Sequence, residues 1–162
     1  MITRGGSLSA TQVARFCGVD LKTIHNWANK GKIPGTRTVG RHLRFRPLDV
    51  VDFLRQYGFE IPEALRQMKL RVLVVDADIA TLATARRLLG KRFDLTTAGH
   101  VVDGLMAAAT QMPDVMVAGN VAPLDAGTIA RRLAAHEATR HVRVVPRGDV
   151  GKLRETLEAM VQ

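Results

Sequence analysis

The sequence predicts two folds in one chain: an α+β unit of short helices and a hairpin at the amino-terminal end, followed by an α/β unit with a parallel sheet. Residues 8–57 carry apolar residues at helical spacing, interrupted by glycine turns and one alternating run. From Leu70 onward, short β-branched runs alternate with helical stretches, which is typical of a parallel sheet covered on both faces. The excess positive charge lies in the first part.

The chain of 162 residues is long enough for two small domains, and 46% hydrophobic residues suffice for their cores. We predict one domain over residues 1–58, a linker over residues 59–69 and a second domain over residues 70–162. The linker is interrupted by Pro62, and Glu63–Met68 can add a helical turn. It does not have the composition of a flexible Gly/Ser linker.

Two short helices around a glycine turn are predicted first. Ser9 and Gln12 have the spacing of a capping box for a helix over roughly Ala10–Cys17, and Gly18 ends it. Asp20 can cap the next helix, because its carboxylate accepts the free N–H groups of the first turn. Two helices joined in this way form a helix-turn-helix.

The second helix has one apolar face, formed by Ile24, Trp27 and Ala28 at positions i, i+3 and i+4. We expect Trp27 to lie in the core rather than to stack on a base. Gly31 is a natural residue for the end of this helix.

A β-hairpin and a third helix follow. Val39 precedes a Gly40-Arg41 turn, after which Leu43 and Phe45 alternate with basic residues. Pro47 closes the hairpin, and a helix is predicted over Leu48–Tyr57, with core contacts from Leu48, Val51, Phe53, Leu54 and Tyr57.

The stretch from Leu21 to Phe45, with Arg46 just after it, holds seven Lys and Arg residues and no acidic residue. Residues 1–69 have a net charge of +7, from 12 Lys and Arg against 5 Asp and Glu, whereas residues 70–162 have +2, from 12 against 10. This imbalance predicts a polyanionic partner for the first part. A solvated basic face is the alternative on charge alone, and the hairpin pattern favours nucleic acid.

Residues 8–57 resemble the winged helix-turn-helix of the MerR and excisionase-like families, including the small BldC-like regulators. The features that carry the resemblance are Thr23, Ile24 and Trp27, then Gly31-Lys32-Ile33-Pro34, then Gly40-Arg41 before Leu43-Arg44-Phe45, then Pro47 with an Asp-Val-x-x-Phe-Leu helix. The resemblance implies binding to double-stranded DNA. The predicted DNA-binding residues are Lys22, Thr23, His25 and Asn26 toward the major groove, Lys30, and Arg37, Thr38, Arg41, His42 and Arg44 in a wing that meets the backbone or minor groove.

Two of these residues have open alternatives. His25 lies near the boundary of the helix face and can equally be a plain surface residue. Arg37 and Val39 are two positions apart and would lie on the same face of the hairpin, so the alternation does not fix which way the Arg37 side chain points. Arg44 is expected to point away from the core face formed by Leu43 and Phe45.

The second half is predicted as alternating strands and helices. Ile79, Leu82, Ala83 and Leu89 are expected to share the buried face of the first helix. The predicted strands are Leu70–Val75, Phe93–Ala98, Asp114–Ala118 and Val142–Val145, and the predicted helices are Ile79–Leu89, Val101–Gln111, Ala126–Ala135 and Gly151–Val161, the last capped by Asp149.

This half, residues 70–162, resembles the receiver domain of bacterial response regulators, which has a flavodoxin-like sheet. The resemblance rests on Leu73-Val74-Val75-Asp76, on Pro113-Asp114-Val115-Met116-Val117 and on Pro123-Leu124-Asp125-Ala126-Gly127. An active receiver binds Mg²⁺ through an acidic pair after the first strand and is phosphorylated on an aspartate after the third. Here Ala77 follows Asp76, and Gly119 stands at the phosphoacceptor position.

The departures from the receiver pattern predict a degenerate domain. Glycine cannot form an acyl phosphate, and Pro146-Arg147 stands where a Lys-Pro pair is expected. The domain is also truncated by one strand–helix unit, which leaves four or five strands. Asp76, Asp78 and Asp114 are then expected to be capping or solvated residues at strand ends.

No motif indicates an enzyme, a metal site or a cofactor. There is no glycine-rich phosphate loop and no Cys/His set with zinc spacing. Cys17, the single cysteine, is expected to be a buried, inert thiol. The start MITRGGSLSA lacks the apolar core of a signal peptide, and no run is long enough to cross a bilayer. We therefore expect a cytoplasmic, nucleoid-associated protein without membrane partners.

The leading hypothesis is a bacterial DNA-binding regulator whose pseudo-receiver domain contacts a protein partner or a second copy of the chain. The alternative is an adaptor or localisation protein in which both domains bind proteins. The basic wing distinguishes them, because an adaptor has no need of it.

Overall fold

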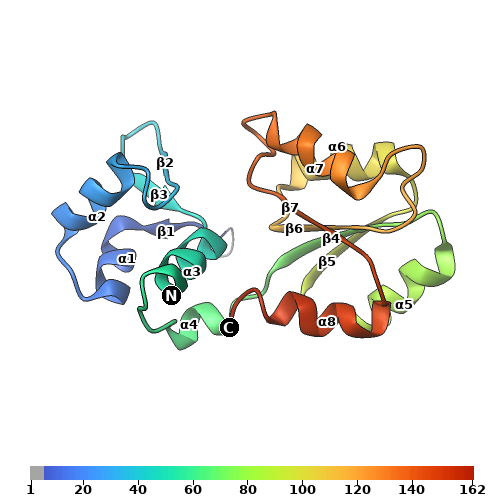
Figure 1. The fold of residues 1–162 in the computed structure, drawn as a ribbon, viewed down its shortest axis with the longest axis horizontal. Helices are drawn as coiled ribbons and strands as arrows, with labels where there is room; N and C mark the ends of the chain where they lie inside the picture. Colours follow the sequence, from blue (N-terminus) through green and yellow to red (C-terminus); the bar gives the residue numbers. More distant parts are fainter. Residues whose placement is uncertain (1–5) are drawn as a thin grey trace. The chain divides into compact units, whose positions relative to one another are not determined.

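A computed structural model describes residues 6–162 of the chain (Figure 1). The expectation for the sequence start involves residues 1–5 as well, and these lie outside the described residues. The chain divides into two compact units: one runs to Met68 and includes Glu158–Gln162, and the other is Lys69–Leu157.

The first unit combines four helices with a small antiparallel sheet. Its strands lie in the order β1-β3-β2, with Leu8 opposite Phe45 and Arg37 opposite Leu43. The helices are α1 (Ala10–Cys17), α2 (Leu21–Asn29), α3 (Pro47–Gln56) and α4 (Glu63–Arg66), and the strands are β1 (Leu8–Ser9), β2 (Thr36–Arg37) and β3 (Leu43–Phe45). The predicted helix-turn-helix and hairpin are confirmed; β1 was not predicted.

The predicted capping box at α1 is confirmed. The Ser9 N–H donates to Gln12 Oε1 at 2.8 Å, and the Gln12 N–H donates to Ser9 Oγ at 3.2 Å. Gly18 ends the helix with φ 65°, a left-handed conformation that glycine adopts without steric cost. These contacts fix where α1 starts and stops, and therefore how soon α2 can begin.

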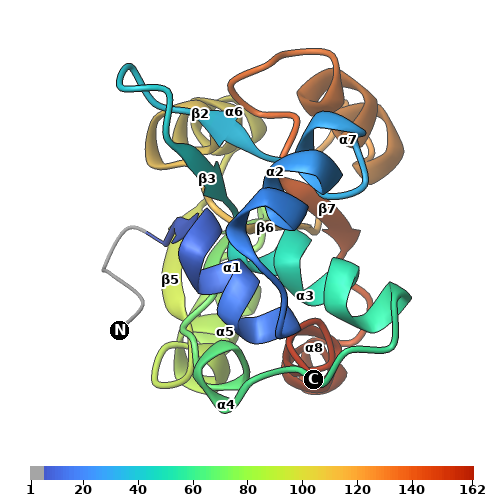
Figure 2. The ribbon, with the colours of Figure 1, turned by 90° about the vertical axis from the view of Figure 1, so that its left-hand side faces the viewer.

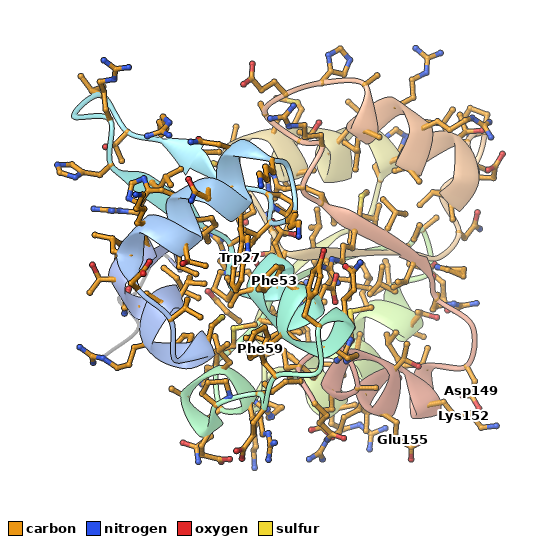
Figure 3. The ribbon with its side chains drawn as sticks, turned by 60° about the vertical axis from the view of Figure 1, so that its left-hand side comes forward. Trp27, Phe53, Phe59, Asp149, Lys152 and Glu155 are labelled. Atoms are coloured by element: carbon orange, nitrogen blue, oxygen red, sulfur yellow. The ribbon has the colours of Figure 1, made fainter. Side chains whose placement is uncertain are left out.

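Trp27 is part of the core, as predicted. Its ring lies 5.2 Å from that of Phe53 and 6.2 Å from that of Phe59, and Figure 3 shows the three rings turned toward one another. Ile24 is fully buried on the same face of α2. The prediction that Tyr57 lies in the core is wrong: Tyr57 follows the last turn of α3 and is 44% exposed, although its ring packs on Phe53.

The second unit is a parallel sheet between two helical layers. The strands are β4 (Arg71–Val75), β5 (Asp94–Ala98), β6 (Val115–Ala118) and β7 (Arg143–Pro146), and the helices are α5 (Ile79–Leu89), α6 (Val101–Gln111), α7 (Ala126–Ala134) and α8 (Val150–Glu158). Helices α6 and α7 cover one face, and α5 and α8 the other (Figure 1). The strand order β5-β4-β6-β7 is the flavodoxin-like order without its fifth strand, which agrees with the predicted truncation.

Close packing joins α6 to the central strand. A Cβ built at Gly104 would lie 2.5 Å from Val75 Cγ2, so only glycine lets the helix approach β4 this closely. On the other face, the predicted buried side of α5 is partly wrong. Leu82, Ala85 and Leu89 are buried, whereas Ile79 is 78% exposed and Ala83 is exposed, because the buried stripe of the helix follows i, i+3 and i+7 from Leu82.

Candidate nucleic-acid interface

Helix α2 presents a polar face opposite its buried one. Lys22, Asn26 and Lys30 are exposed, whereas Thr23 and His25 are half-buried. Ile24 is fully buried and marks the side of this nine-residue helix that packs on the core, so the opposite side is accessible to a partner. The structure thus places the predicted α2 residues on one accessible surface, with Thr23 and His25 at its margin.

Both ends of α2 are fixed by local hydrogen bonds. Asp20 Oδ1 accepts the Thr23 N–H at 2.7 Å, and hydrogen bonds from the Thr23 backbone and side chain lower the pKa of Asp20 below its ordinary value. At the other end the Gly31 N–H donates to the Ala28 carbonyl and the Lys32 N–H to the Trp27 carbonyl, a Schellman motif with Gly31 at φ 69°. The Thr23 hydroxyl therefore serves the cap as well as the predicted surface.

The hairpin between β2 and β3 forms a tight, projecting tip (Figure 2). The Thr38 N–H donates to the His42 carbonyl at 3.0 Å, and the Arg41 N–H donates to the Thr38 carbonyl at 2.7 Å. Thr38 Oγ1 also accepts the His42 N–H at 3.2 Å, and Arg41 has a left-handed φ of 61°. Val39, at the tip, is fully exposed. The predicted wing is thus a defined loop that exposes Arg41 and His42.

The arginines of the wing differ in how they are held. Arg44 is half-buried, between the buried side chains of Leu43 and Phe45 in sequence, and its Nη1 donates to the Leu43 carbonyl at 3.0 Å. Arg37 is exposed and donates through Nη2 to Asn29 Oδ1 at 3.1 Å and through Nη1 to the Arg41 carbonyl at 3.2 Å. The direction of Arg37, which the alternation left open, is toward the end of α2 and the tip of the wing.

Among residues 6–162, no carboxylate neutralises the three arginines of the wing. In the part of the chain that the structure describes, neither Arg37, Arg41 nor Arg44 forms an ion pair with a carboxylate. Their hydrogen bonds go to neutral oxygens. The wing and the exposed face of α2 therefore form an electropositive surface, which we call the basic surface: Lys22, Asn26, Lys30, Arg37, Thr38, Arg41, His42 and Arg44.

Asn29 is a residue of this region that the sequence did not single out. It is the last residue of α2, and its amide oxygen holds the Arg37 guanidinium. No local pattern could have found it, because the two side chains lie eight residues apart across a turn and meet only in the folded unit.

In the second unit, a buried carboxylate lies at the carboxyl end of the sheet. Asp76 follows β4 and is fully buried; its Oδ1 accepts the Asp78 N–H at 2.9 Å, and its Oδ2 lies 3.4 Å from Nη1 of Arg147. Arg147 also donates to the Thr81 hydroxyl at 2.8 Å. Asp76 is thus neither a solvated nor a capping residue, and this prediction is wrong because β4 and the end of β7 come together only in the parallel sheet.

The other two strand-end carboxylates differ from each other. Asp78 caps α5, as predicted, and hydrogen bonds from the Thr81 hydroxyl and then the Ala80 N–H lower its pKa. Asp114 instead accepts the backbone N–H of Arg71 at 2.8 Å and lies 3.3 Å from its guanidinium, so the prediction of a capping or solvated residue is wrong for Asp114. Both contacts of Asp114 are made across the sheet between segments 43 residues apart.

The position after β6 has no space for a side chain. The Gly119 N–H donates to the Val75 carbonyl, which sets this residue beside the end of β4. A Cβ built at Gly119 would collide with Oδ2 of Asp76. The Asp76 carboxylate therefore fills the place in which a side chain at position 119 would stand.

Comparison with known proteins finds a family model that matches the first unit. Residues 7–58 match the family model of a helix-turn-helix domain. A solved structure described as a response regulator from Desulfuromonas acetoxidans is 19% identical, with a TM-score of 0.42, and the match covers 56% of this chain and 77% of that chain. A search of curated proteins finds no match.

The helix-turn-helix domain spans the whole basic surface, since the matched residues 7–58 run from β1 to the end of α3. Burial raises the pKa of the Cys17 thiol in this domain to about 11, so the reactive thiolate is scarce at neutral pH. Over residues 6–162 no group of three His, Cys, Asp or Glu side chains is placed to hold a metal ion, and no helix is long and apolar enough to cross a membrane.

Proposed function

We propose that the protein is a bacterial DNA-binding regulator whose helix-turn-helix domain binds duplex DNA of the nucleoid through α2 and the β2–β3 wing. In this proposal Lys22, Asn26 and, at the margin, Thr23 and His25 approach base edges. The wing residues Arg37, Arg41, His42 and Arg44 and the helix-end residue Lys30 meet the phosphate backbone or minor groove. The relationship to MerR and excisionase-like regulators is part of the proposal.

The observation that supports this function best is the lack of carboxylate partners for the wing arginines. An arginine that is exposed and unpaired keeps its full charge for a polyanion, and each phosphate contact releases a counterion. A protein-binding adaptor has no use for a surface on which Arg37, Arg41 and Arg44 stand without neutralising carboxylates among residues 6–162.

We further propose that the second unit is a pseudo-receiver with no enzymatic activity. Its strand order and the buried Asp76 at the end of β4 support the receiver likeness. Gly119 provides no carboxylate to accept a phosphoryl group, and the nearby space is taken by Asp76. Helix α6 leaves Val102 52% and Met106 63% exposed, which supports a role in protein contacts, including self-association.

Titration of the full chain against a labelled random duplex tests DNA binding. The four cations placed at the phosphate backbone, Lys30, Arg37, Arg41 and Arg44, predict that log Kd rises with log salt with a slope of about 3.6, since each phosphate contact contributes about 0.9. No binding at low salt would leave the adaptor function as the better account. If the protein binds duplex DNA, selection of bound fragments from genomic DNA would give the operator sequence.

Incubation with a small-molecule phosphodonor and Mg²⁺ tests the pseudo-receiver. We expect no labelled protein by mass spectrometry, because position 119 has no carboxylate. Stable, Mg²⁺-dependent labelling of residues 70–162 would contradict the proposal.

A further inference from the structure

The carboxyl-terminal end of α2 and the wing are joined by one side chain. The Arg37 guanidinium donates Nη2–H to Asn29 Oδ1 at 3.1 Å, and Nη1–H to the Arg41 carbonyl at 3.2 Å. Asn29 ends α2, Arg37 ends β2, and Arg41 lies in the wing tip. One planar group therefore connects the three parts of the domain that the proposed function brings to DNA.

Only an arginine can make both contacts. Its guanidinium is a rigid fork with donors on two different nitrogens, whereas a lysine ammonium is a single point charge on a flexible chain. Both acceptors are neutral oxygens, so neither contact offsets the positive charge of Arg37 with a negative one.

The wing has few other means of holding its position. Strand β2 has two exposed residues, paired with β3 through Thr36–Arg44 and Arg37–Leu43. The tip beyond it is held by the bonds between Thr38 and Arg41 or His42, which close the loop on itself but do not connect it to a helix. Strand β3 is also paired with β1 and buries Leu43 and Phe45, so β2 and the tip are the parts of this small sheet with the least other support.

We propose that Asn29 is a positioning residue, which acts through Arg37 to set the distance between the exposed face of α2 and the wing tip. The effect of Asn29 on affinity rests on the proposed DNA-binding function. The distance between α2 and the wing tip decides whether both reach their DNA contacts together. Asn29 carries no charge and contributes to binding through geometry rather than through counterion release.

A double-mutant cycle tests the inference in the full chain, with Asn29→Ala, Arg37→Lys and both changes together. Each single variant should bind a random duplex about three-fold more weakly, the effect of a modest hydrogen bond. The salt slope should stay unchanged, since both variants keep every positive charge. The double variant should be no weaker than Arg37→Lys alone, because both changes break the same link. Additive losses would overturn the inference.

Amide exchange of the free protein separates this inference from the proposed function. The N–H groups of Thr38, Arg41 and His42 should exchange faster by about three-fold in Asn29→Ala and Arg37→Lys. They should exchange at the wild-type rate in Arg41→Lys, a control that keeps the Arg41 backbone carbonyl. Unchanged exchange in both link variants would refute the positioning role. Faster exchange in a protein that fails to bind DNA would support the link and reject the DNA-binding function.

Discussion

The wing arginines of the helix-turn-helix domain and two arginines at strand ends of the second unit have opposite surroundings. In the helix-turn-helix domain, Arg37, Arg41 and Arg44 bond only to neutral oxygens among the described residues or stand exposed. In the second unit, Arg71 and Arg147 lie 3.3 and 3.4 Å from the carboxylates of Asp114 and Asp76. One set of cations has no carboxylate partner among the described residues, and the other neutralises carboxylates of its own fold.

This difference indicates how the total charge should be read. Residues 1–69 and residues 70–162 each hold 12 Lys and Arg, so the number of basic residues does not distinguish the two parts of the chain. The two parts differ in the number of Asp and Glu residues, 5 against 10, and in whether these carboxylates form ion pairs with the arginines compared above. Substitutions in the first set should therefore change binding, and substitutions in the second set should change stability.

The largest effect is expected from Gly119→Asp. The new side chain would collide with Asp76 and add a second carboxylate beside one that is fully buried. We expect the second unit to lose more than about 3 kcal/mol of its free energy of unfolding, from an uncompensated buried charge and overpacking. Amide exchange of β4 and β6 would measure this loss in the second unit.

Gly99→Ala is the matched control for that change. A Cβ at Gly99 meets only Leu82 Cδ1, at 4.0 Å, so the substitution should be tolerated. A stable, phosphorylatable Gly119→Asp protein would show that the space beside Asp76 is open and that the site is closer to an active receiver than we propose.

Arg147→Ala should destabilise the second unit by about 2 kcal/mol. It leaves the buried Asp76 without its cation, and the cost is reduced because the Arg147 side chain is 34% exposed. Duplex affinity should not change. Arg87→Ala, which removes an exposed cation from α5, should alter stability by less than about 0.5 kcal/mol. Equal stability of the two variants would contradict the internal role of Arg147.

A smaller effect is expected from Asp20→Ala at the start of α2. The folded pKa of Asp20 is lowered, so its carboxylate contributes stability above the ordinary value of 3.8, and this contribution is lost as pH falls through the folded pKa. Wild type should melt above the variant at neutral pH, and the gap should close on acidification. Trp27, the single tryptophan, reports this unit by fluorescence. A gap that widened in acid would contradict the cap.

Local patterns predicted most of the fold, because caps and helix faces depend on nearby residues. The Ser9–Gln12 box, Asp20, Gly31 and the helix Ile79–Leu89 all agree with the structure. Strand β1 was missed, since it has two residues and pairs with a segment 35 to 37 positions away. The Asp76–Arg147 pair was missed for the same reason: its partners are far apart in sequence, and the parallel sheet brings them together.

In the proposed interface, the sequence predicted which residues are basic and which of them share a surface, but not how they are held. The alternation in the hairpin predicted buried Leu43 and Phe45 with Arg44 between them. It could not predict that Arg37 bonds to Asn29, because that contact depends on the path of the turn between α2 and β2.

The salt dependence of duplex binding, compared between wild type and the Arg41→Ala/Arg44→Ala variant, tests the central comparison most directly. If the wing cations meet phosphates, the slope of log Kd against log salt should fall by about 1.8, while Arg147→Ala leaves the slope unchanged. A double variant that binds duplex with the wild-type affinity and slope would contradict the account.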